Sequence, residues 1–318
     1  MQPGLVQLRT RVLGISVAET TFARRGFQPT APAVQQHLER VGRAFVHGYQ
    51  AALESSALPA LVGRLLACAP EFRGFAFEGA AMASALLDAC TPWRPDRVRR
   101  LMAGPGADHI YMLHVGVGWA LARLPVRLER AITRFDPLLR WLIVDGYGFH
   151  AGYFNWPRTI DRQEQPRQLS AYARRVFDQG LGRSLWFVKG ADIARIQATV
   201  AAFPAARQPD LWGGVGLACA YAGGVDAAAI EALQRAAEPY QLCLAQGAAF
   251  AAQARLRANL AAPHTEMACA ILCGGSLAEA AAVTQQALAD LRDDAATPAY
   301  DQWQQRIRSF FVERISVS

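Results

Sequence analysis

Four short sequence landmarks occur twice, in the same order, along this chain of 318 residues. The pairs are residues 45–48 (FVHG) with 177–180 (FDQG), 77–83 (FEGAAMA) with 212–218 (WGGVGLA), 114–120 (HVGVGWA) with 245–251 (AQGAAFA), and 143–146 (IVDG) with 271–274 (ILCG). Their offsets are, by subtraction, 132, 135, 131 and 128 residues. Four collinear pairs at a nearly constant offset indicate duplication and fusion of one unit of roughly 130 residues.

Apolar residues recur at helical spacing through the first unit, which predicts a series of helices. These span residues 40–53, 60–68, 78–89, 96–103, 108–124 and 137–144. We therefore expect an all-α fold of two diverged tandem helical repeats related by pseudo-two-fold symmetry. Glycine inside a helix costs about 1 kcal/mol relative to alanine. Because both copies keep Gly79 and Gly116 (as Gly214 and Gly247), these glycines predict close helix crossings.

The two repeats are predicted to lie between an N-terminal arm and a C-terminal helix. The arm is residues 1–36, and within it residues 20–27 are expected to form a docked turn. The first repeat is 37–154, a polar linker with two prolines is 155–168, and the second, degenerate repeat is 169–295. Residues 296–318 contain the last helix, which is amphipathic and carries Trp303, Ile307, Phe310 and Phe311.

Hydrophobic residues make up 52% of the chain and charged residues 19%, so a large buried core is expected. No run of about 18 uninterrupted apolar residues occurs, which excludes a simple membrane-spanning helix. The first residues lack the charged start and apolar core of a secretory signal. These features predict a cytoplasmic protein without a transmembrane span, and a peripheral contact with a membrane stays open.

The net charge of +7 would suit a nucleic-acid surface, but its distribution argues against one. Lys189 is the only lysine, and the arginines are scattered along the chain. We therefore predict no nucleic-acid partner. The six cysteines form no C-x-x-C pair, which favours packing roles over redox or metal chemistry.

The two copies differ in their polar residues, and this difference carries most of the functional prediction. With the offsets above, His47 faces Gln179, Glu78 faces Gly213, His114 faces Ala245 and Asp145 faces Cys273. The first copy also ends in residues 145–154 (DGYGFHAGYF), a run with no counterpart in the second copy. Titratable side chains within apolar helices are costly to bury alone. They are therefore expected to meet one another, a ligand or a metal.

The candidate catalytic residues are His150, His114, Glu78 and Asp145. His150 is the strongest candidate, because a loop rich in glycine and aromatic residues is a favourable place for a catalytic side chain. Each of the others has a structural alternative. Glu78 could complement a helix N-terminus, His114 could be a satisfied core histidine, and Asp145 could bond a local turn. His109, near a helix start, is predicted to be exposed.

The four candidates could also bind Fe, Mn or Zn, although their spacing specifies neither a metal nor any other cofactor. Familiar catalytic signatures are absent. There is no G-x-G-x-x-G, no G-x-x-x-x-G-K-[ST], no H-E-x-x-H and no G-x-S-x-G in the sequence. The reaction therefore stays open at this stage.

Residues 77–83, 114–122 and 145–154, together with the arm segment 21–27 (TFARRGF), resemble a known bacterial family over nearly the whole chain. That family is domain of unknown function 1702, which includes the UnbL-like proteins of enediyne polyketide gene cassettes. The resemblance implies an accessory protein encoded beside an iterative polyketide synthase and acting on its polyene product. It implies no catalytic residues.

Three functions compete on this basis. The first is an accessory enzyme of natural-product biosynthesis that modifies a long apolar polyene-like substrate between the two repeats by acid/base or metal-assisted chemistry. The second is a non-catalytic scaffold for a polyketide synthase or another cassette protein. The third is a carrier that binds and shields a polyene. A homodimer is compatible with each of them.

Overall fold

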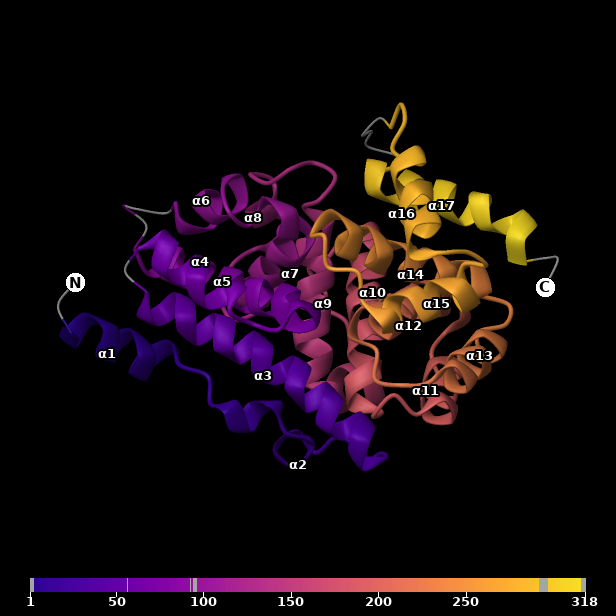
Figure 1. The fold of residues 1–318 in the computed structure, drawn as a ribbon, viewed down its shortest axis with the longest axis horizontal. Helices are drawn as coiled ribbons and strands as arrows, with labels where there is room; N and C mark the ends of the chain where they lie inside the picture. The colour runs from indigo at the N-terminus through magenta and orange to yellow at the C-terminus, as the bar shows by residue number, and fades with distance from the viewer. Residues whose placement is uncertain (1–2, 56, 92, 94–95, 292–296, 316–318) are drawn as a thin grey trace.

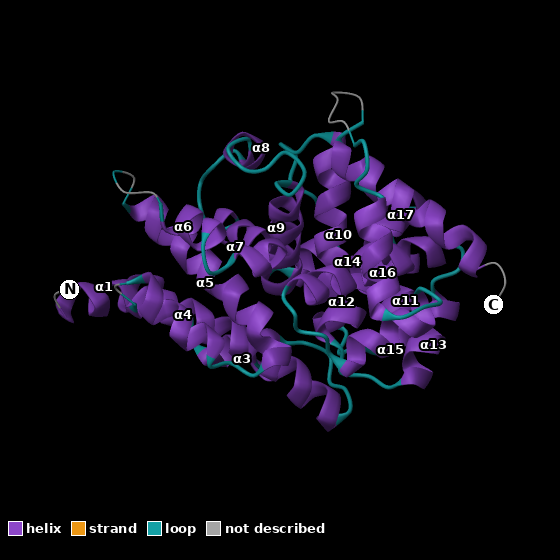
Figure 2. Ribbon diagram, turned by 45° about the horizontal axis from the view of Figure 1, so that its top comes forward, coloured by secondary structure: helices purple, strands orange, loops and turns teal. Residues whose placement is uncertain are grey.

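A computed structural model of the chain describes residues 3–55, 57–91, 93, 96–291 and 297–315. Within these ranges every regular element is a helix, as Figures 1 and 2 show. The predicted all-α class is therefore confirmed. The predicted boundary between the second repeat and the C-terminal helix, at residues 295 and 296, lies outside the described residues.

Alternate helices of the chain pack side by side in chain order, each against the next. They are α3 (Pro32–Glu54), α5 (Pro70–Cys90), α7 (Ile110–Leu121), α9 (Trp141–Phe154), α10 (Ala171–Val188), α12 (Gln208–Ala222), α14 (Gln241–Arg257) and α16 (Leu277–Gln286). In both views α9 and α10 lie next to each other near the middle of the molecule. They join the half formed by α3 to α9 to the half formed by α10 to α16.

Shorter helices connect the members of this series. They are α4 (Leu58–Leu66), α6 (Arg97–Ala103), α8 (Leu128–Ile132), α11 (Ile193–Ala201), α13 (Ala227–Ala236) and α15 (Pro263–Leu272). Single helical turns form at η2 (Ala107–His109), η3 (Pro157–Asp161) and η4 (Ala205–Arg207). The same alternation of packed and connecting helices thus occurs in both halves.

Three helices extend further than the apolar periodicity predicts. α3 begins at Pro32 instead of residue 40, so it includes the last residues assigned to the N-terminal arm. α5 begins at Pro70, so Glu78 lies in mid-helix, and the prediction that it complements a helix N-terminus is wrong. α9 continues to Phe154, so the run 145–154 is helical and His150 does not lie in a loop. Gly146 and Gly148 made this run look like a loop. They serve instead as crossing points on α9, where Gly146 lies against Val115 O of α7 and Gly148 against Phe177 O of α10.

Glycines lie where neighbouring helices touch through their backbones. A Cβ atom on Gly79 of α5 would overlap the carbonyl oxygen of Phe45 on α3, and one on Gly180 of α10 would overlap that of Asp145 on α9. Two residues further on, Gly182 meets Leu211 of α12 in the same way. Residues two apart lie on opposite sides of a helix, so one Gly-x-Gly pair contacts both neighbours. The predicted crossing role of these glycines is confirmed.

The crossings also correct the alignment of the two halves. Gly48 of α3 meets Ala76 of the following packed helix, and the equivalent contact in the second half joins Gly182 to Leu211. The counterpart of Gly48 is therefore Gly182, at an offset of 134, and not Gly180, at 132. The Gly79 and Gly116 crossings keep their predicted counterparts.

The fourth landmark pair is not equivalent in the structure. Gly146 lies within α9 against the carbonyl oxygen of Val115, whereas Gly274 follows the end of α15 in a left-handed conformation, with φ of 66°. Asp145 therefore has no counterpart at Cys273. The pseudo-two-fold relation between the halves stays a prediction.

Hydrogen bonds from side chains to backbone carbonyl oxygens of distant segments hold the two halves together. Arg255 of α14 donates to the carbonyl oxygens of Glu71, beside the start of α5, and Tyr221, near the end of α12, at 2.8 and 2.7 Å. The imidazole of His37, on α3, contacts Ala222 O at 2.6 Å. The end of α12 is therefore fixed against the first half.

The N-terminal arm contains α1 (Pro3–Leu13), η1 (Val17–Thr20) and α2 (Phe22–Arg25). Arg25 donates to Phe154 O at 2.9 Å, and the indole of Trp156 donates to Arg25 O at 3.0 Å. Phe22 and Phe27 are buried and stack edge to face. The docked turn predicted for residues 20–27 is thus confirmed.

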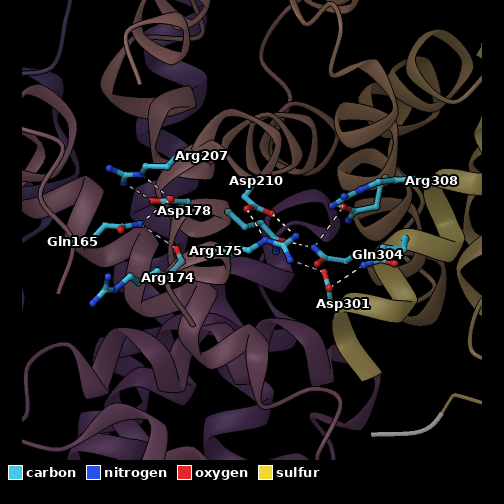
Figure 3. Close-up of polar contacts among 12 residues, drawn as sticks. Gln165, Arg174, Arg175, Asp178, Arg207, Asp210, Asp301, Gln304 and Arg308 are labelled. Atoms are coloured by element: carbon cyan, nitrogen blue, oxygen red, sulfur yellow. Dashed lines mark hydrogen bonds and ion pairs between the residues drawn. The ribbon is translucent and has the colours of Figure 1, made fainter. Parts of the chain in front are cut away.

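The C-terminal helix α17 (Ala299–Ile315) packs on α14 and α16, at one end of the molecule in Figure 1. Trp303, Ile307 and Phe311 are buried, while Phe310 is 45% exposed, as expected of an amphipathic helix. Figure 3 shows the polar contacts around α10, where Arg175 lies between Asp210 of α12 and Asp301 of α17.

A second ion pair in Figure 3 joins α10 to the segment before α12. Arg207 contacts Asp178 at 2.6 Å, and Gln165 of the predicted linker donates to the same carboxylate at 2.8 Å. The linker is therefore held against the second half.

We expect Gly180→Ala to destabilise the fold, because its methyl group would collide with the backbone of α9. Overpacking of this kind costs about 1–3 kcal/mol. The control is Gly63→Ala in α4, where a Cβ meets nothing within 4 Å. It should gain up to about 1 kcal/mol from helix propensity. Denaturant unfolding measures both, and equal effects at the two sites would contradict the crossing role.

Candidate functional site

A partly enclosed cavity lies between the two halves of the molecule. Its walls come from α3, α5, α7 and α9 on one side and from α10 and α12 on the other, and residues of the N-terminal arm line it as well. The empty space amounts to about 660 Å³, including open solvent at the mouth. The lining is mostly apolar. It includes Val41, Phe45, Phe75, Trp119, Phe149 and Leu217.

Glu78 projects into this apolar cavity from the middle of α5. Its side chain is buried, with 2% of the residue exposed, and among the described residues its carboxyl group has no ion-pair partner, while the indole N–H of Trp119 is its hydrogen-bond donor. Burial raises the pKa of Glu78 to about 7. Arg183 lowers this pKa, Asp145 raises it, and the nearby indole N–H of Trp119 lowers it. A carboxyl group with such a pKa can accept or donate a proton near neutral pH.

Arg183 and Asp145 form a buried ion pair beside Glu78. Arg183 Nη1 donates to Asp145 Oδ1, and the guanidinium also lies 4.9 Å from the ring centre of Phe149. Burial alone would lower the pKa of Arg183, and the neighbouring Asp145 and Glu78 raise it. The guanidinium therefore remains charged within the apolar interior, next to a glutamate that has no such partner.

Tyr221 completes the polar part of the cavity. A Cβ on Gly74 would overlap its hydroxyl, so this hydroxyl touches α5. Gly74 and Glu78 are one helical turn apart and therefore share a face of α5. The hydroxyl of Tyr221 thus lies beside the face from which Glu78 projects. Burial raises the pKa of Tyr221, which keeps the hydroxyl protonated as a potential donor.

A second, narrower cavity adjoins the first. It is lined by Asp145 and by side chains of α7, α12, α14 and α17, and it shares Arg183, Leu217 and Tyr221 with the first cavity. Its empty space is about 480 Å³. Arg183 and Tyr221 therefore lie at the boundary between two apolar spaces.

Buried amides connect Asp145 to the C-terminal helix. Gln179 donates to Asp145 Oδ2 at 2.9 Å, and Gln304 of α17 donates to Gln179 Oε1 at 2.5 Å. Tyr300, also on α17, accepts from Gln179 at 3.2 Å. Asp145 is therefore fully engaged by structural partners, and Glu78 is the carboxyl group left available.

The structure does not bring the four predicted site residues together. His114 lines a different groove, between α5, α6, α7 and α8, with 2% of the residue exposed. Its Nδ1 lies 2.8 Å from the carbonyl oxygen of Ile110, one turn earlier on α7. Burial lowers the pKa of His114, while that hydrogen bond and Asp136 raise it. This placement matches the alternative of a satisfied core histidine.

His150 lies among aromatic rings on α9 and does not line either interior cavity. It packs on Trp119 and Phe154, and burial, with the charges of Arg123 and Arg25, lowers the pKa of His150 to about 3. It is therefore neutral at physiological pH. Among the four candidates, only Glu78 and Asp145 line the two adjoining interior cavities.

Two further histidines also differ from their predicted settings. His47, one of the residues lost in the second copy, is exposed on α3. His109 is not exposed as predicted but buried, with its ring stacked 4.0 Å from that of Phe77. Burial lowers the pKa of His109 to about 4.

Sequence reasoning missed Arg183 and Tyr221. Arg183 has a signal of its own, since it is a charged residue within the strongly apolar run 181–188 of α10. Such a residue needs a buried partner. The partner, Asp145, is 38 positions away, and only the crossing of α9 and α10 brings the two together.

Comparison with known families assigns the chain. The model of the family described as "Protein of unknown function (DUF1702)" matches residues 4–311. The chain belongs to this family. No curated protein and no solved structure matches the chain. The family predicted by the resemblance is thus confirmed, and Glu78, Asp145, Arg183 and Tyr221 all lie within the matched region.

The part of the chain described by the structure shows neither a simple membrane span nor a metal-type cluster. By length and apolar character, no single helix there could cross a bilayer, although α15 and α16, bent by 67°, would pass as a pair. Among the described residues, no three His, Cys, Asp or Glu side chains are grouped as metal ligands would be. Glu78, His114, Asp145 and His150, which could have bound a metal together, are not grouped in this way among these residues.

The raised pKa of Glu78 predicts how stability depends on pH. The folded state holds this proton more tightly than the unfolded state, whose pKa is 4.5, so folding becomes less favourable as pH rises from 4.5 through about 7. Glu78→Gln removes the titration. Its unfolding free energy relative to wild type should therefore increase by about 3 kcal/mol between pH 4.5 and pH 8.

Denaturant unfolding at several pH values measures this difference. The control is Glu231→Gln on α13, which replaces an exposed glutamate and should give a difference that does not change with pH. A flat profile for Glu78→Gln as well would show that Glu78 is not held in its protonated form.

Proposed function

We propose that this chain is an accessory enzyme of natural-product biosynthesis, of the enediyne or polyene polyketide type. Its substrate is a long, apolar, polyene-like molecule bound in the cavity between the two halves. The observation that carries the proposal is a buried glutamate without an ion-pair partner of its own, Glu78, in a mostly apolar cavity. Burying a carboxyl group without a partner is costly, and a pKa near neutrality is typical of a general acid or base.

The cavity supports acid/base chemistry on an apolar molecule. Glu78 can donate its proton to a substrate atom and take one back later, so that the enzyme returns to its starting state. Arg183 and Tyr221 lie on the same side of the cavity and can stabilise negative charge that develops on a substrate oxygen. An apolar substrate that fills the cavity displaces water from it, which strengthens these electrostatic interactions.

A carrier that binds and shields a polyene is the second candidate. The same apolar lining favours it. His114 and His150 do not line the cavity, so Glu78 has no histidine beside it to take part in proton transfer, and a site that only binds needs none. A scaffold for a polyketide synthase would use the outer surface instead, and would leave the interior glutamate without a role.

The decisive experiment is Glu78→Gln in a reconstituted pathway. We expect product formation to fall by about 10²–10⁴-fold, the usual contribution of a general acid or base. Binding of the substrate should persist, because glutamine keeps the shape of the side chain. The control is Glu231→Gln, which should match the wild type. Unchanged product formation by folded Glu78→Gln would exclude the enzyme and favour the carrier.

A further inference from the structure

Arg183 has donors that the fold does not use. Its Nη1 donates to Asp145, and among the described residues no other hydrogen bond is made by its guanidinium. A guanidinium has five N–H donors in a planar fork, and a carboxylate is the ligand that fits this fork best. Because Arg183 lines both interior cavities, its free donors are directed into space that a ligand could fill.

The neighbouring side chains decide which form of the site accepts an anion. The charged or titratable groups that face Glu78 are Asp145 on α9, Arg183 on α10 and Tyr221 on α12, and Glu19 of the arm lines the same cavity. Glu19 is already paired with Arg24 and Arg25. With Glu78 ionised, the charges of Glu78, Asp145 and Arg183 add up to a net negative charge that repels an anion. With Glu78 protonated, they cancel.

We propose that the cavity binds a long apolar carboxylic acid, whose carboxylate accepts hydrogen bonds from Arg183 and from the protonated carboxyl group of Glu78. This inference rests on the proposed function, because it names the end group of the apolar substrate. The acid group lies at the boundary of the two cavities, and the hydrocarbon chain packs against Phe45, Trp119 and Phe149. No bond is made or broken in this step. One proton is held on Glu78 while the ligand is bound.

The orientation of the bound acid follows from the position of the polar groups. Glu78, Arg183 and Tyr221 are close together, while the remainder of the lining is apolar. A molecule with one polar end and a hydrocarbon tail satisfies both parts of the cavity. A molecule without a polar end leaves the buried donors of Arg183 unmatched, which is unfavourable.

The test uses cis-parinaric acid, a conjugated tetraene acid whose fluorescence rises in an apolar site, and its methyl ester. Binding of the acid should require protonated Glu78. Since the pKa of Glu78 is about 7, the Kd of the acid should rise about tenfold from pH 6 to pH 8. The ester carries no charge, so its Kd should be the same at both pH values.

Two variants test the residues themselves. Glu78→Gln should bind the acid equally well at both pH values and more tightly than the wild type at pH 8. Arg183→Gln would leave Asp145 buried without its partner, so the double variant Arg183→Gln with Asp145→Asn is the better choice. At pH 6, where Glu78 is protonated, it should bind the acid no more tightly than the ester, because the guanidinium that receives the carboxylate is gone. Glu231→Gln should behave as the wild type.

Three results would overturn the proposal. The first is that the wild type binds neither ligand. The second is that it binds acid and ester with the same pH dependence of Kd. The third is that the Kd of the acid for Glu78→Gln depends on pH as it does for the wild type. The proposed function fails separately. Acid-selective binding with normal product formation by Glu78→Gln would exclude catalysis alone, whereas loss of product without acid selectivity would exclude the carboxylate end group alone.

Discussion

Direct contact between helix backbones, made possible by glycine, is the constraint on which this structure depends. The same contacts determine where the polar interior lies. Gly180 touches the carbonyl oxygen of Asp145, and one turn further along α10 Arg183 reaches the carboxylate of that residue. Gly116 touches the carbonyl oxygen of Glu78 on the next crossing. The residues of the candidate site are therefore held by the points where the helices come closest.

The interior treats its two carboxyl groups differently. Asp145 receives hydrogen bonds from Arg183 and Gln179, so its charge is compensated within the fold. Glu78 has no ion-pair partner of its own among the described residues, and the indole of Trp119 offsets only part of the cost of burial, so the pKa of Glu78 is raised. A hydrophobic residue of similar size would avoid this cost. Glu78 therefore costs the fold stability that such a residue would not cost.

Local patterns predicted the helices and the crossing glycines well, because both depend on periodicity within a short segment. The site was predicted only in part. Glu78 and Asp145 stood out as polar residues in apolar surroundings, whereas Arg183 needed a contact over 38 positions. His114 and His150 failed to join them because the direction of a side chain depends on how its whole helix is rotated against its neighbours. That rotation is a tertiary property, and no spacing within one helix reveals it.

The corrected alignment changes the meaning of the asymmetry between the halves. Gly79 contacts the backbone of Phe45 and Tyr49 on α3. Its counterpart Gly214 contacts the backbone of Gln179 and Arg183 on α10. Arg183 thus occupies the position of Tyr49, whose hydroxyl donates to Leu13 O in the N-terminal arm.

Glu78, for its part, faces Gly213, as the sequence alignment predicted. The first half therefore supplies the carboxyl group and the second half the guanidinium. The sequence comparison placed the whole site in the first half, with the second half degenerate. In the structure the polar residues of the candidate site come from both halves, Glu78 and Asp145 from the first and Arg183 and Tyr221 from the second. The single polar centre therefore depends on the contact between the halves, and neither half contains it alone.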